Sequence, residues 1–303
     1  MSTPDAEPTH EGSDAQTRRD WLAQGPFTLA LGAGFFGFFA HTGVLQALER
    51  AGLRPQRVTG VSAGALAGGL WASGLAADEL AEELMALRRP DFWDPGLPLG
   101  GLLRGRKFAR KLEVILGKSG TSYFRDCEIP FATVAYDVLR RAPVVLDQGR
   151  LAPAIQASCT VPLMFRPLLH ARRVLVDGGV RDRNGESALG AGDRVLMHAL
   201  PTTSPLRHIR SSERDAQAIH AGPGRMILQI PELPRVSPFR LEQGPLALER
   251  ARAWTTEWLS SPGSAWPSCL SVRTGGTPWA CAQLRCVLRK AWTSTPVIRR
   301  RIQ

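Results

Sequence analysis

The segment RVTGVSAGALAGGLWAS, residues 57–73, contains the pattern that decides the fold. Its first residues predict a short strand, and the small apolar residues that follow predict a buried helix. At the junction, Gly60-Val61-Ser62-Ala63-Gly64 matches G-x-S-x-G, in which a serine occupies a sharp turn between a strand and a helix. Glycine on both sides gives the backbone room to turn, and the helix N-terminus stabilises developing negative charge. We therefore predict that Ser62 is a nucleophile and that Gly60 and Gly64 form its turn; a Gly-Ser turn without chemistry is the alternative.

A glycine-rich stretch precedes this segment. Phe27–Leu31 predicts a buried strand and leads into Gly32-Ala33-Gly34-Phe35-Phe36-Gly37. The stretch matches the dinucleotide-binding pattern G-x-G-x-x-G, which also needs an acidic residue about 20 residues further on. No Asp or Glu occurs between Glu49 and Asp78, which argues against a dinucleotide site. We expect instead that backbone N–H groups of Gly34 and Phe35 form an oxyanion hole, although a turn that only permits close packing is the alternative.

A third motif supplies a candidate acid. Val174-Leu175-Val176-Asp177-Gly178-Gly179 predicts an apolar strand that ends in an aspartate followed by two glycines. Because α/β folds bind ligands at the carboxyl ends of strands, we predict that Asp177 lies in the site; an ordinary Asp-Gly turn is the alternative. An α/β-hydrolase would use a histidine after the acid, and the candidates are His198, His208 and His220. That fold places more strands before its nucleophile, so we favour a dyad in which Asp177 accepts the serine proton directly. We expect His41 to be a packing residue.

The remaining pattern alternates strands with helices, which predicts an α/β fold with a largely parallel central sheet. We expect three regions along the chain. Residues 1–24 are rich in Ser, Thr, Asp, Glu and Pro and predict a disordered N-terminal segment. Residues 25–259 form the predicted hydrolase domain. Residues 260–303 contain seven Arg or Lys residues and no acid, and predict a basic, poorly ordered tail.

Composition limits the partners of the protein. The formal net charge of +11 suits contact with anionic lipid headgroups, and no nucleic-acid-binding motif accompanies it. A predicted basic helix, Phe108–Leu116, carries Arg110 and Lys111 and follows Lys107. We favour an ordinary surface helix, and peripheral contact with a membrane is the alternative hypothesis. The five cysteines show no metal-ligand spacing, and residues 1–20 lack the pattern of a signal peptide. We therefore expect reduced thiols and a cytoplasmic location, in part peripheral to a membrane.

The motifs occur in an order that resembles the patatin-like phospholipase family over residues 27–200. Four blocks carry the resemblance: Leu29–Leu45 is similar to the glycine-rich oxyanion segment, Gly60–Gly64 to the nucleophile turn, Ala154–Pro162 to the stretch before the acid, and Asp177-Gly178-Gly179 to the acid motif. The resemblance implies a three-layer α/β/α fold, a Ser62–Asp177 dyad, and hydrolysis of acyl esters in phospholipids or other lipids. It implies no metal or organic cofactor.

The glycine stretch departs from the family pattern of three glycines, a variable residue, then Arg or Lys and Gly. Ala33 and Phe35 stand at the first and third glycine positions, and Gly37 stands at the basic position. The phenylalanines here, Phe35, Phe36, Phe38 and Phe39, are expected either to line an acyl-chain pocket or to pack in the core. A catalytically weakened lipid-binding protein on the same scaffold is therefore an alternative function.

Overall fold

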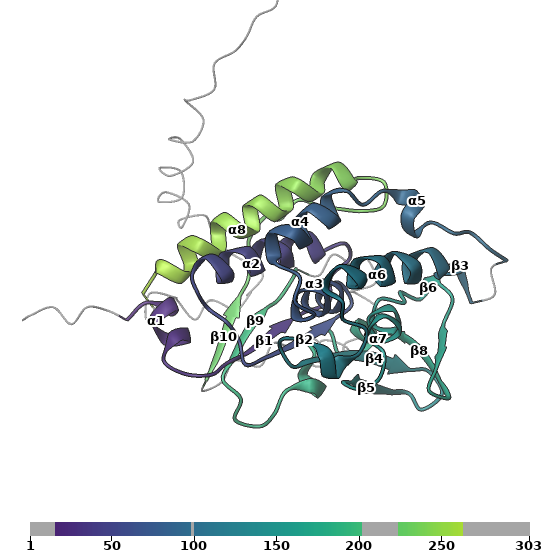
Figure 1. The fold of residues 1–303 in the computed structure, drawn as a ribbon, viewed down its shortest axis with the longest axis horizontal. Helices are drawn as coiled ribbons and strands as arrows, with labels where there is room; N and C mark the ends of the chain where they lie inside the picture. The colour runs from purple at the N-terminus through teal and green to yellow at the C-terminus, as the bar shows by residue number, and fades with distance from the viewer. Residues whose placement is uncertain (1–15, 98–99, 202–223, 263–303) are drawn as a thin grey trace, which may run out of the picture. The chain divides into compact units, whose positions relative to one another are not determined.

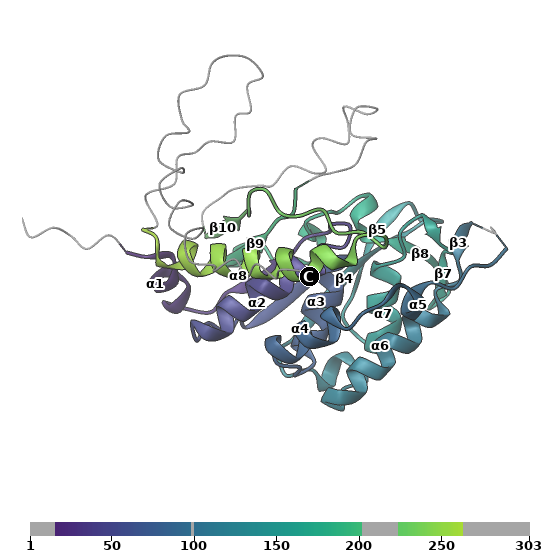
Figure 2. The same cartoon turned by 90° about the horizontal axis from the view of Figure 1, so that it is seen from above.

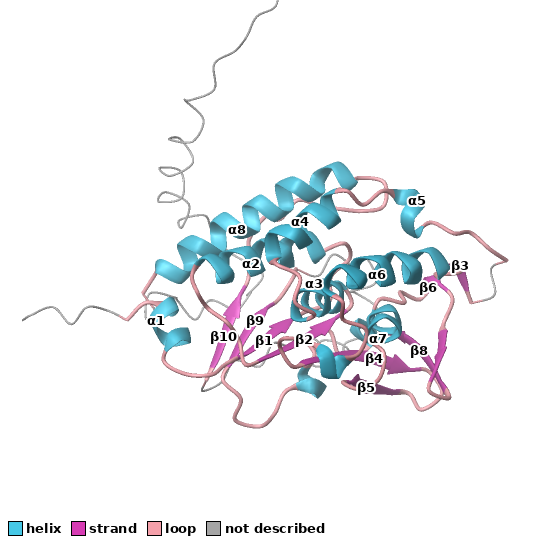
Figure 3. Cartoon of the chain, in the orientation of Figure 1, coloured by secondary structure: helices cyan, strands magenta, loops and turns pink. Residues whose placement is uncertain are grey.

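The structure is a computed structural model that describes residues 16–97, 100–201 and 224–262. These residues form one mixed sheet covered by helices, drawn in Figures 1 and 3. The strand order is β10-β9-β1-β2-β4-β8-β7, and β5 pairs with the remaining side of β4. The strands are β1 (Thr28–Leu31), β2 (Arg57–Val61), β4 (Phe131–Asp137), β5 (Ala142–Leu146), β7 (Leu168–His170), β8 (Arg173–Asp177), β9 (Val195–His198) and β10 (Arg225–Leu228).

The centre of the sheet is parallel, which confirms the predicted fold class. Strands β10, β9, β1, β2 and β4 run in one direction. The antiparallel pairs are β4–β5, β4–β8 and β8–β7. Central parallel strands are buried on both faces, so their sequences are continuous apolar runs. In β1, for example, Leu29 and Leu31 join the larger core cluster and Ala30 joins a smaller one.

Helices cover one face of the sheet. The helices are α2 (Phe38–Arg50), α3 (Ala63–Ala72), α4 (Ala77–Met85), α6 (Arg106–Ser119), α7 (Leu151–Ser158) and α8 (Gly244–Ser260). Helices α2 and α8 lie side by side, as Figures 1 and 2 both show. The opposite face of the sheet is covered, among the described residues, by the segment after β8. This segment contains the short 3-10 helices η2 (Gly178–Val180) and η3 (Glu186–Ala188). None of the helices that the structure describes is both long and apolar enough to cross a bilayer.

Several short elements differ from the sequence prediction. Helix α1 (Arg18–Ala23) lies inside the segment predicted to be disordered, so that prediction is wrong for these residues. A capping box between Thr17 and Asp20 starts α1, and Leu22 is buried, which is enough to anchor one helical turn. Residues 1–15 and 263–303 lie outside the described residues, so the rest of the predicted domain boundaries remains a prediction.

Four further elements were missed because they are too short to show a period. Two of them are α5 (Arg89–Phe92) and β3 (Gly101–Leu103), which lie in or beside the Pro- and Gly-rich stretch 91–105. Strand β3 pairs with β6 (Leu163–Phe165) in a separate two-stranded sheet, and β7 was also not predicted. A three-residue strand shows too little of an alternation to be distinguished from a loop.

Candidate active site

Ser62 lies between the end of β2 and the start of α3, where the backbone turns sharply. Its φ of 55° and ψ of −116° are unusual for a residue with a side chain, and such strain persists only where neighbours enforce it. The Ser62 N–H donates to Ser158 Oγ at 2.9 Å, and the Ser158 hydroxyl donates to Val134 O at 2.6 Å. Ser158 therefore ties the strained turn to the neighbouring strand β4.

The glycines around Ser62 leave no room for a side chain. A Cβ on Gly60 would lie 2.4 Å from Gly64 O, and a Cβ on Gly64 would lie 2.0 Å from Leu31 O. Helix α3 therefore starts in direct contact with strand β1. Its first N–H groups, which have no intrahelical acceptor, surround the position of Ser62.

Asp177 ends strand β8 and contacts Ser62 directly. The Ser62 hydroxyl donates to Asp177 Oδ2 at 2.5 Å, and the Gly179 N–H donates to Asp177 Oδ1 at 2.8 Å. The two residues meet along one side of β4, because Val61 pairs with Val134 and the next residue of β4, Ala135, pairs with Asp177. Asp177 ends its strand as predicted and reaches Ser62, although β8 is antiparallel to β4 and not one of the parallel central strands.

Burial raises the pKa of the Asp177 carboxyl group into the range that suits a general base. The side chain is 5% exposed, and burial raises its pKa to about 6 against the opposing hydrogen bonds from Ser62 and Gly179 and the charge of Arg183. At neutral pH the group is ionised and able to accept a proton, and its pKa lies close to the working pH, as general base catalysis requires.

The glycine loop, residues 32–37, follows β1, and three of its N–H groups, those of Gly34, Phe35 and Phe36, have no acceptor among the described residues. The Gly32 N–H donates to His198 O at 3.1 Å, the Ala33 N–H to Arg183 O at 2.7 Å, and the Gly37 N–H to Gly34 O at 2.9 Å. Within the described ranges, no protein group accepts from the N–H of Gly34 or Phe35. Both residues line the same pocket as Ser62, so these two N–H groups are available to a ligand there.

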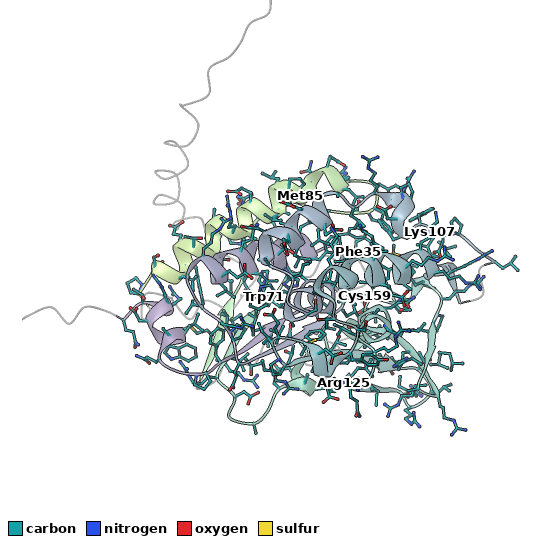
Figure 4. The ribbon with its side chains drawn as sticks, viewed as in Figure 1. Phe35, Trp71, Met85, Lys107, Arg125 and Cys159 are labelled. Carbon is teal, nitrogen blue, oxygen red and sulfur yellow. The ribbon has the colours of Figure 1, made fainter. Side chains whose placement is uncertain are left out.

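Ser62 lies in the wall of an apolar pocket. The empty space of this pocket, including the part open to solvent, is about 730 Å³. Three of the four phenylalanines named above, Phe35, Phe36 and Phe38, line it, whereas Phe39 is core and packs against Gly244. The other apolar lining residues come from α3 to α7 and β6 and include Leu66, Leu84, Leu87, Phe92, Phe108, Leu112, Ile115, Val161, Met164 and Phe165. Figure 4 labels two of the lining residues, Phe35 in the glycine loop and Cys159 directly after α7.

We assign no catalytic role to Cys159, the cysteine that lines this pocket. Burial, and then the charge of Asp177, raise the pKa of the Cys159 thiol well above its usual value. The thiol therefore stays protonated, and it donates to Ser62 O at 3.1 Å. Cys127 and Cys159 form no disulfide, while Cys269, Cys281 and Cys286 lie outside the described residues. Within the part of the chain that is described, no cluster of His, Cys, Asp and Glu is suited to hold a metal ion.

Of the three histidine alternatives, the structure describes only His198, and it is not bonded to Ser62. His198 is buried and is bonded to His41 through Nδ1 at 2.8 Å, so the idea of His198 as a catalytic partner of Ser62 is wrong. His208 and His220 lie outside the described residues. His41 was expected only to pack, but its Nε2 lies 2.8 Å from Gly32 O, so it also holds the glycine loop.

Sequence reasoning did not single out Ser158 or Arg183. Ser158 falls inside the block Ala154–Pro162, so its position was available as a signal although its role was not. Arg183 donates to Leu200 O at 2.8 Å and to Pro201 O at 3.0 Å, and its charge acts on Asp177. No motif marks Arg183, because its contacts depend on how the loop after η2 folds back.

Comparisons with known proteins match the part of the chain that builds this site. Residues 29–189 match the family model described as patatin-like phospholipase. An uncharacterised NTE family protein of Mycobacterium tuberculosis is 34% identical over 157 residues, which are 51% of this chain and 42% of the relative. The neuropathy target esterase of Drosophila melanogaster is 27% identical over 175 residues, which are 55% of this chain and 12% of that protein. The matched regions thus span less than half the length of these relatives.

A solved structure resembles the fold at low sequence identity. VipD from Legionella pneumophila superposes with a TM-score of 0.55 and 12% identity, covering 78% of this chain and 67% of that chain. At this identity the likeness concerns the fold alone.

Proposed function

Because the chain belongs to the patatin-like phospholipase family, we propose that it is a serine acyl hydrolase that cleaves ester-linked fatty acyl chains from lipids. In this proposal Ser62 is the nucleophile and Asp177 is the base. One observation carries it: the 2.5 Å hydrogen bond from Ser62 Oγ to Asp177 Oδ2, at the wall of an apolar pocket. A nucleophile that is hydrogen-bonded to a base of suitable pKa is the common requirement of acyl transfer through a covalent intermediate.

The first step forms an acyl-enzyme. Asp177 Oδ2 takes the hydroxyl proton as Ser62 Oγ attacks the ester carbonyl carbon, and the carbonyl electron pair moves onto oxygen. The N–H groups of Gly34 and Phe35 donate to this oxyanion, which is the charge that the site must stabilise. When the carbonyl re-forms, the bond to the alcohol breaks, and the alcohol leaves with the proton held by Asp177.

The second step releases the fatty acid. Asp177 takes a proton from a water molecule, which attacks the acyl carbon. The resulting oxyanion is held by the same N–H groups. Collapse breaks the bond to Ser62 Oγ, which recovers its proton from Asp177.

The lining of the pocket supports a lipid acyl chain as the bound group. The side chains named above are almost all aliphatic or aromatic, and the charged Lys111 has its ammonium group bonded to Glu83 at 3.0 Å. Burial of an acyl chain against such a surface contributes about 0.8 kcal/mol per CH₂ group. An ester with a longer apolar chain is therefore expected to bind more tightly until the pocket is full.

Two substitutions test the proposed dyad. Ser62→Ala and Asp177→Asn are each expected to lower kcat on a short acyl ester by about 10³-fold or more. Ser73→Ala is the matched control, because Ser73 caps the other end of α3 and its hydroxyl is hydrogen-bonded to Leu70 O and Ser119 Oγ. Wild-type protein should also be labelled at Ser62 by a fluorophosphonate probe. Full activity of either dyad variant in a preparation free of other esterases would refute the assignment.

The alternative of a lipid-binding protein with weakened catalysis predicts a different pair of results. It is motivated by Phe35, whose side chain is 52% exposed in the glycine loop. In that case the protein would bind fatty acid in the apolar pocket, yet Ser62 would not react with the fluorophosphonate. Labelling of Ser62 together with ester turnover would exclude this alternative.

Peripheral membrane contact is a further part of the proposal. On α6, Arg110 and Lys107 are exposed, whereas Lys111 is partly buried and paired with Glu83. Replacing both exposed residues by Gln is expected to weaken binding to anionic vesicles by about tenfold or more, since each basic residue near such a surface contributes about 1 kcal/mol. Lys118→Gln, on the last turn of the same helix, is the control. Equal co-sedimentation of the double variant and wild type would contradict membrane contact by this face.

A further inference from the structure

Two buried histidines hold the start of the glycine loop. His41 on α2 and His198 at the end of β9 are both 0% exposed, and their rings meet edge to face at 82°. Their Nδ1 atoms are 2.8 Å apart, and His41 Nε2 is 2.8 Å from Gly32 O. The catalytic steps proposed above use neither ring.

The contacts determine where the protons lie. Gly32 O can only accept, so His41 Nε2 carries a proton and donates to it. Burial lowers the pKa of His41 to about 4, so at neutral pH the ring is uncharged and its Nδ1 is an acceptor. His198 must then carry its proton on Nδ1 and donate to His41. This leaves His198 Nε2 as a buried acceptor, and among the described residues it has no hydrogen-bond partner.

The pair holds Gly32 at both of its polar groups. The Gly32 N–H donates to the backbone oxygen of His198, while the Gly32 oxygen accepts from the ring of His41. Strand β1 ends at Leu31, so Gly32 sets the direction in which the loop leaves the sheet. The Ala33 N–H is bonded to Arg183 O, and the next three N–H groups, on Gly34, Phe35 and Phe36, have no acceptor among the described residues. The first two of these are the proposed oxyanion donors.

A packing role does not explain this pair. Two apolar side chains of similar volume would fill the same space without desolvating four ring nitrogens, and a buried polar atom without a partner is destabilising. The imidazoles supply something that apolar side chains lack, which is a directed hydrogen bond to the loop. Buried polar groups that cost stability in this way are typical of functional sites.

We propose that His41 and His198 are positioning residues that orient the glycine loop, so that the N–H groups of Gly34 and Phe35 face the oxyanion formed at Ser62. The inference rests on the proposed function and adds to it two residues that touch no substrate. His41 acts through Gly32, and His198 acts by fixing which nitrogen of His41 carries the proton.

Two substitutions at His41 separate the contacts of its ring. In His41→Asn the amide reaches the position of Nδ1, so it keeps the contact with His198 but has no donor for Gly32 O. In His41→Gln the amide nitrogen reaches the position of Nε2, so the bond to Gly32 O is retained. Both variants carry the same amide group and differ in length by one CH₂ group, so the main difference between them is the bond to the loop.

The experiment measures kcat and KM on a short acyl ester, and the inhibition constant of a trifluoromethyl ketone that forms an oxyanion adduct with serine. His41→Asn is expected to lower kcat by about tenfold or more, within the range for a disturbed oxyanion donor, with little change in KM. Its inhibition constant should rise by the same factor as kcat/KM falls. His41→Gln is expected to restore kcat to within about threefold of wild type.

Substitutions at His198 provide a second test that does not depend on the folding of the His41 variants. His198→Asn keeps a donor at the Nδ1 position and removes the unpartnered Nε2, so it is expected to stay active. His198→Leu removes the donor and is expected to lower kcat in the same way as His41→Asn. Thermal unfolding of each variant shows whether a loss of kcat follows the loop bond or the stability of the whole protein.

The outcomes distinguish this inference from the proposed function. If wild type turns over ester and Ser62→Ala does not, but His41→Asn and His198→Leu keep full kcat, then only the positioning role is wrong. If the donor-keeping and donor-lacking variants lose kcat equally, in step with their thermal stability, then the pair is structural and the positioning role is again wrong. If wild type neither turns over ester nor reacts with the inhibitor, both the proposed function and this inference fail.

Discussion

Asp177→Asn is expected to make the protein more stable at pH 7.5 while abolishing hydrolysis. Burial raises the pKa of Asp177 from 3.8 to about 6, so the folded protein binds this proton more tightly than the unfolded chain does. Between about pH 4 and pH 6 the folded state therefore loses stability as the pH rises. A pKa difference of this size corresponds to about 3 kcal/mol at pH 7.5, and to about 0.5 kcal/mol at pH 4. Because asparagine is neutral at both pH values, the variant does not carry this cost.

The assay is urea unfolding followed by tryptophan fluorescence at pH 7.5 and pH 4. The variant should exceed wild type in free energy of unfolding by about 3 kcal/mol at pH 7.5, and most of that advantage should disappear at pH 4. Asp182→Asn is the matched control. Both carboxylate oxygens of buried Asp182 accept from backbone N–H groups, those of Glu186 and Ser187, so the amide NH₂ introduced there would face a donor and should destabilise the fold. At Asp177 only one oxygen faces a backbone N–H, and the other faces the Ser62 hydroxyl, which can also accept. If Asp177→Asn unfolds at the same or lower urea concentration than wild type at pH 7.5, the argument from burial is refuted.

Four further predictions concern rate and packing. Below about pH 6, kcat/KM on a short acyl ester should fall by about tenfold per pH unit, because the base Asp177 is then protonated; a flat profile to pH 5 would contradict its role. Gly64→Ala should lower the free energy of unfolding by more than about 3 kcal/mol, since its Cβ would lie 2.0 Å from a strand carbonyl oxygen, whereas Gly117→Ala, with nothing within 4 Å, should be tolerated in the same denaturation assay. Ser158→Ala removes the acceptor for the amide of the nucleophile and should cost about 1–3 kcal/mol in the same assay, together with a lower kcat. Leu87→Trp fills part of the pocket and should reduce turnover of long-chain esters more than of short-chain esters; an equal effect on both would place the acyl chain elsewhere.

The central strands and the two glycine turns were predictable because each carries a strong local signal. β1 and β2 are short apolar runs that end in glycine, and Gly60, Ser62 and Gly64 follow a pattern that only a strand–turn–helix accommodates. The directions of the later strands were not predictable. β8 has the same apolar composition as a parallel strand, and its antiparallel pairing depends on contacts with β4 and β7 that are distant in sequence.

The contacts that support the site could not be predicted from the sequence for the same reason, because they join residues that are distant in the chain. His41 and His198 are far apart in the sequence, and nothing in the type of either residue shows that the rings meet at Gly32. Ser158 belongs to a recognised block, but its role depends on the register that brings Val134 beside Val61. A residue that forms the turn belongs to a local sequence motif, whereas a residue that supports the turn from another helix or strand does not.

The packing of the phenylalanines explains how a glycine loop with bulky side chains leaves the N–H groups of Gly34 and Phe35 without acceptors in the described part of the chain. Phe36 has a φ of 55°, a conformation disfavoured for a residue of its size, and its ring packs against Phe38 at 5.4 Å and Phe92 at 5.8 Å. Ser62, on the same pocket, also has a φ of 55°, so two strained residues face one cavity. Strain of about 1–3 kcal/mol per residue persists only where the surroundings enforce it. At Ser62 the enforcing contact is a hydrogen bond, and at Phe36 it is aromatic packing, so replacing Phe36 by glycine would relieve the backbone but release the loop that the proposed oxyanion hole needs.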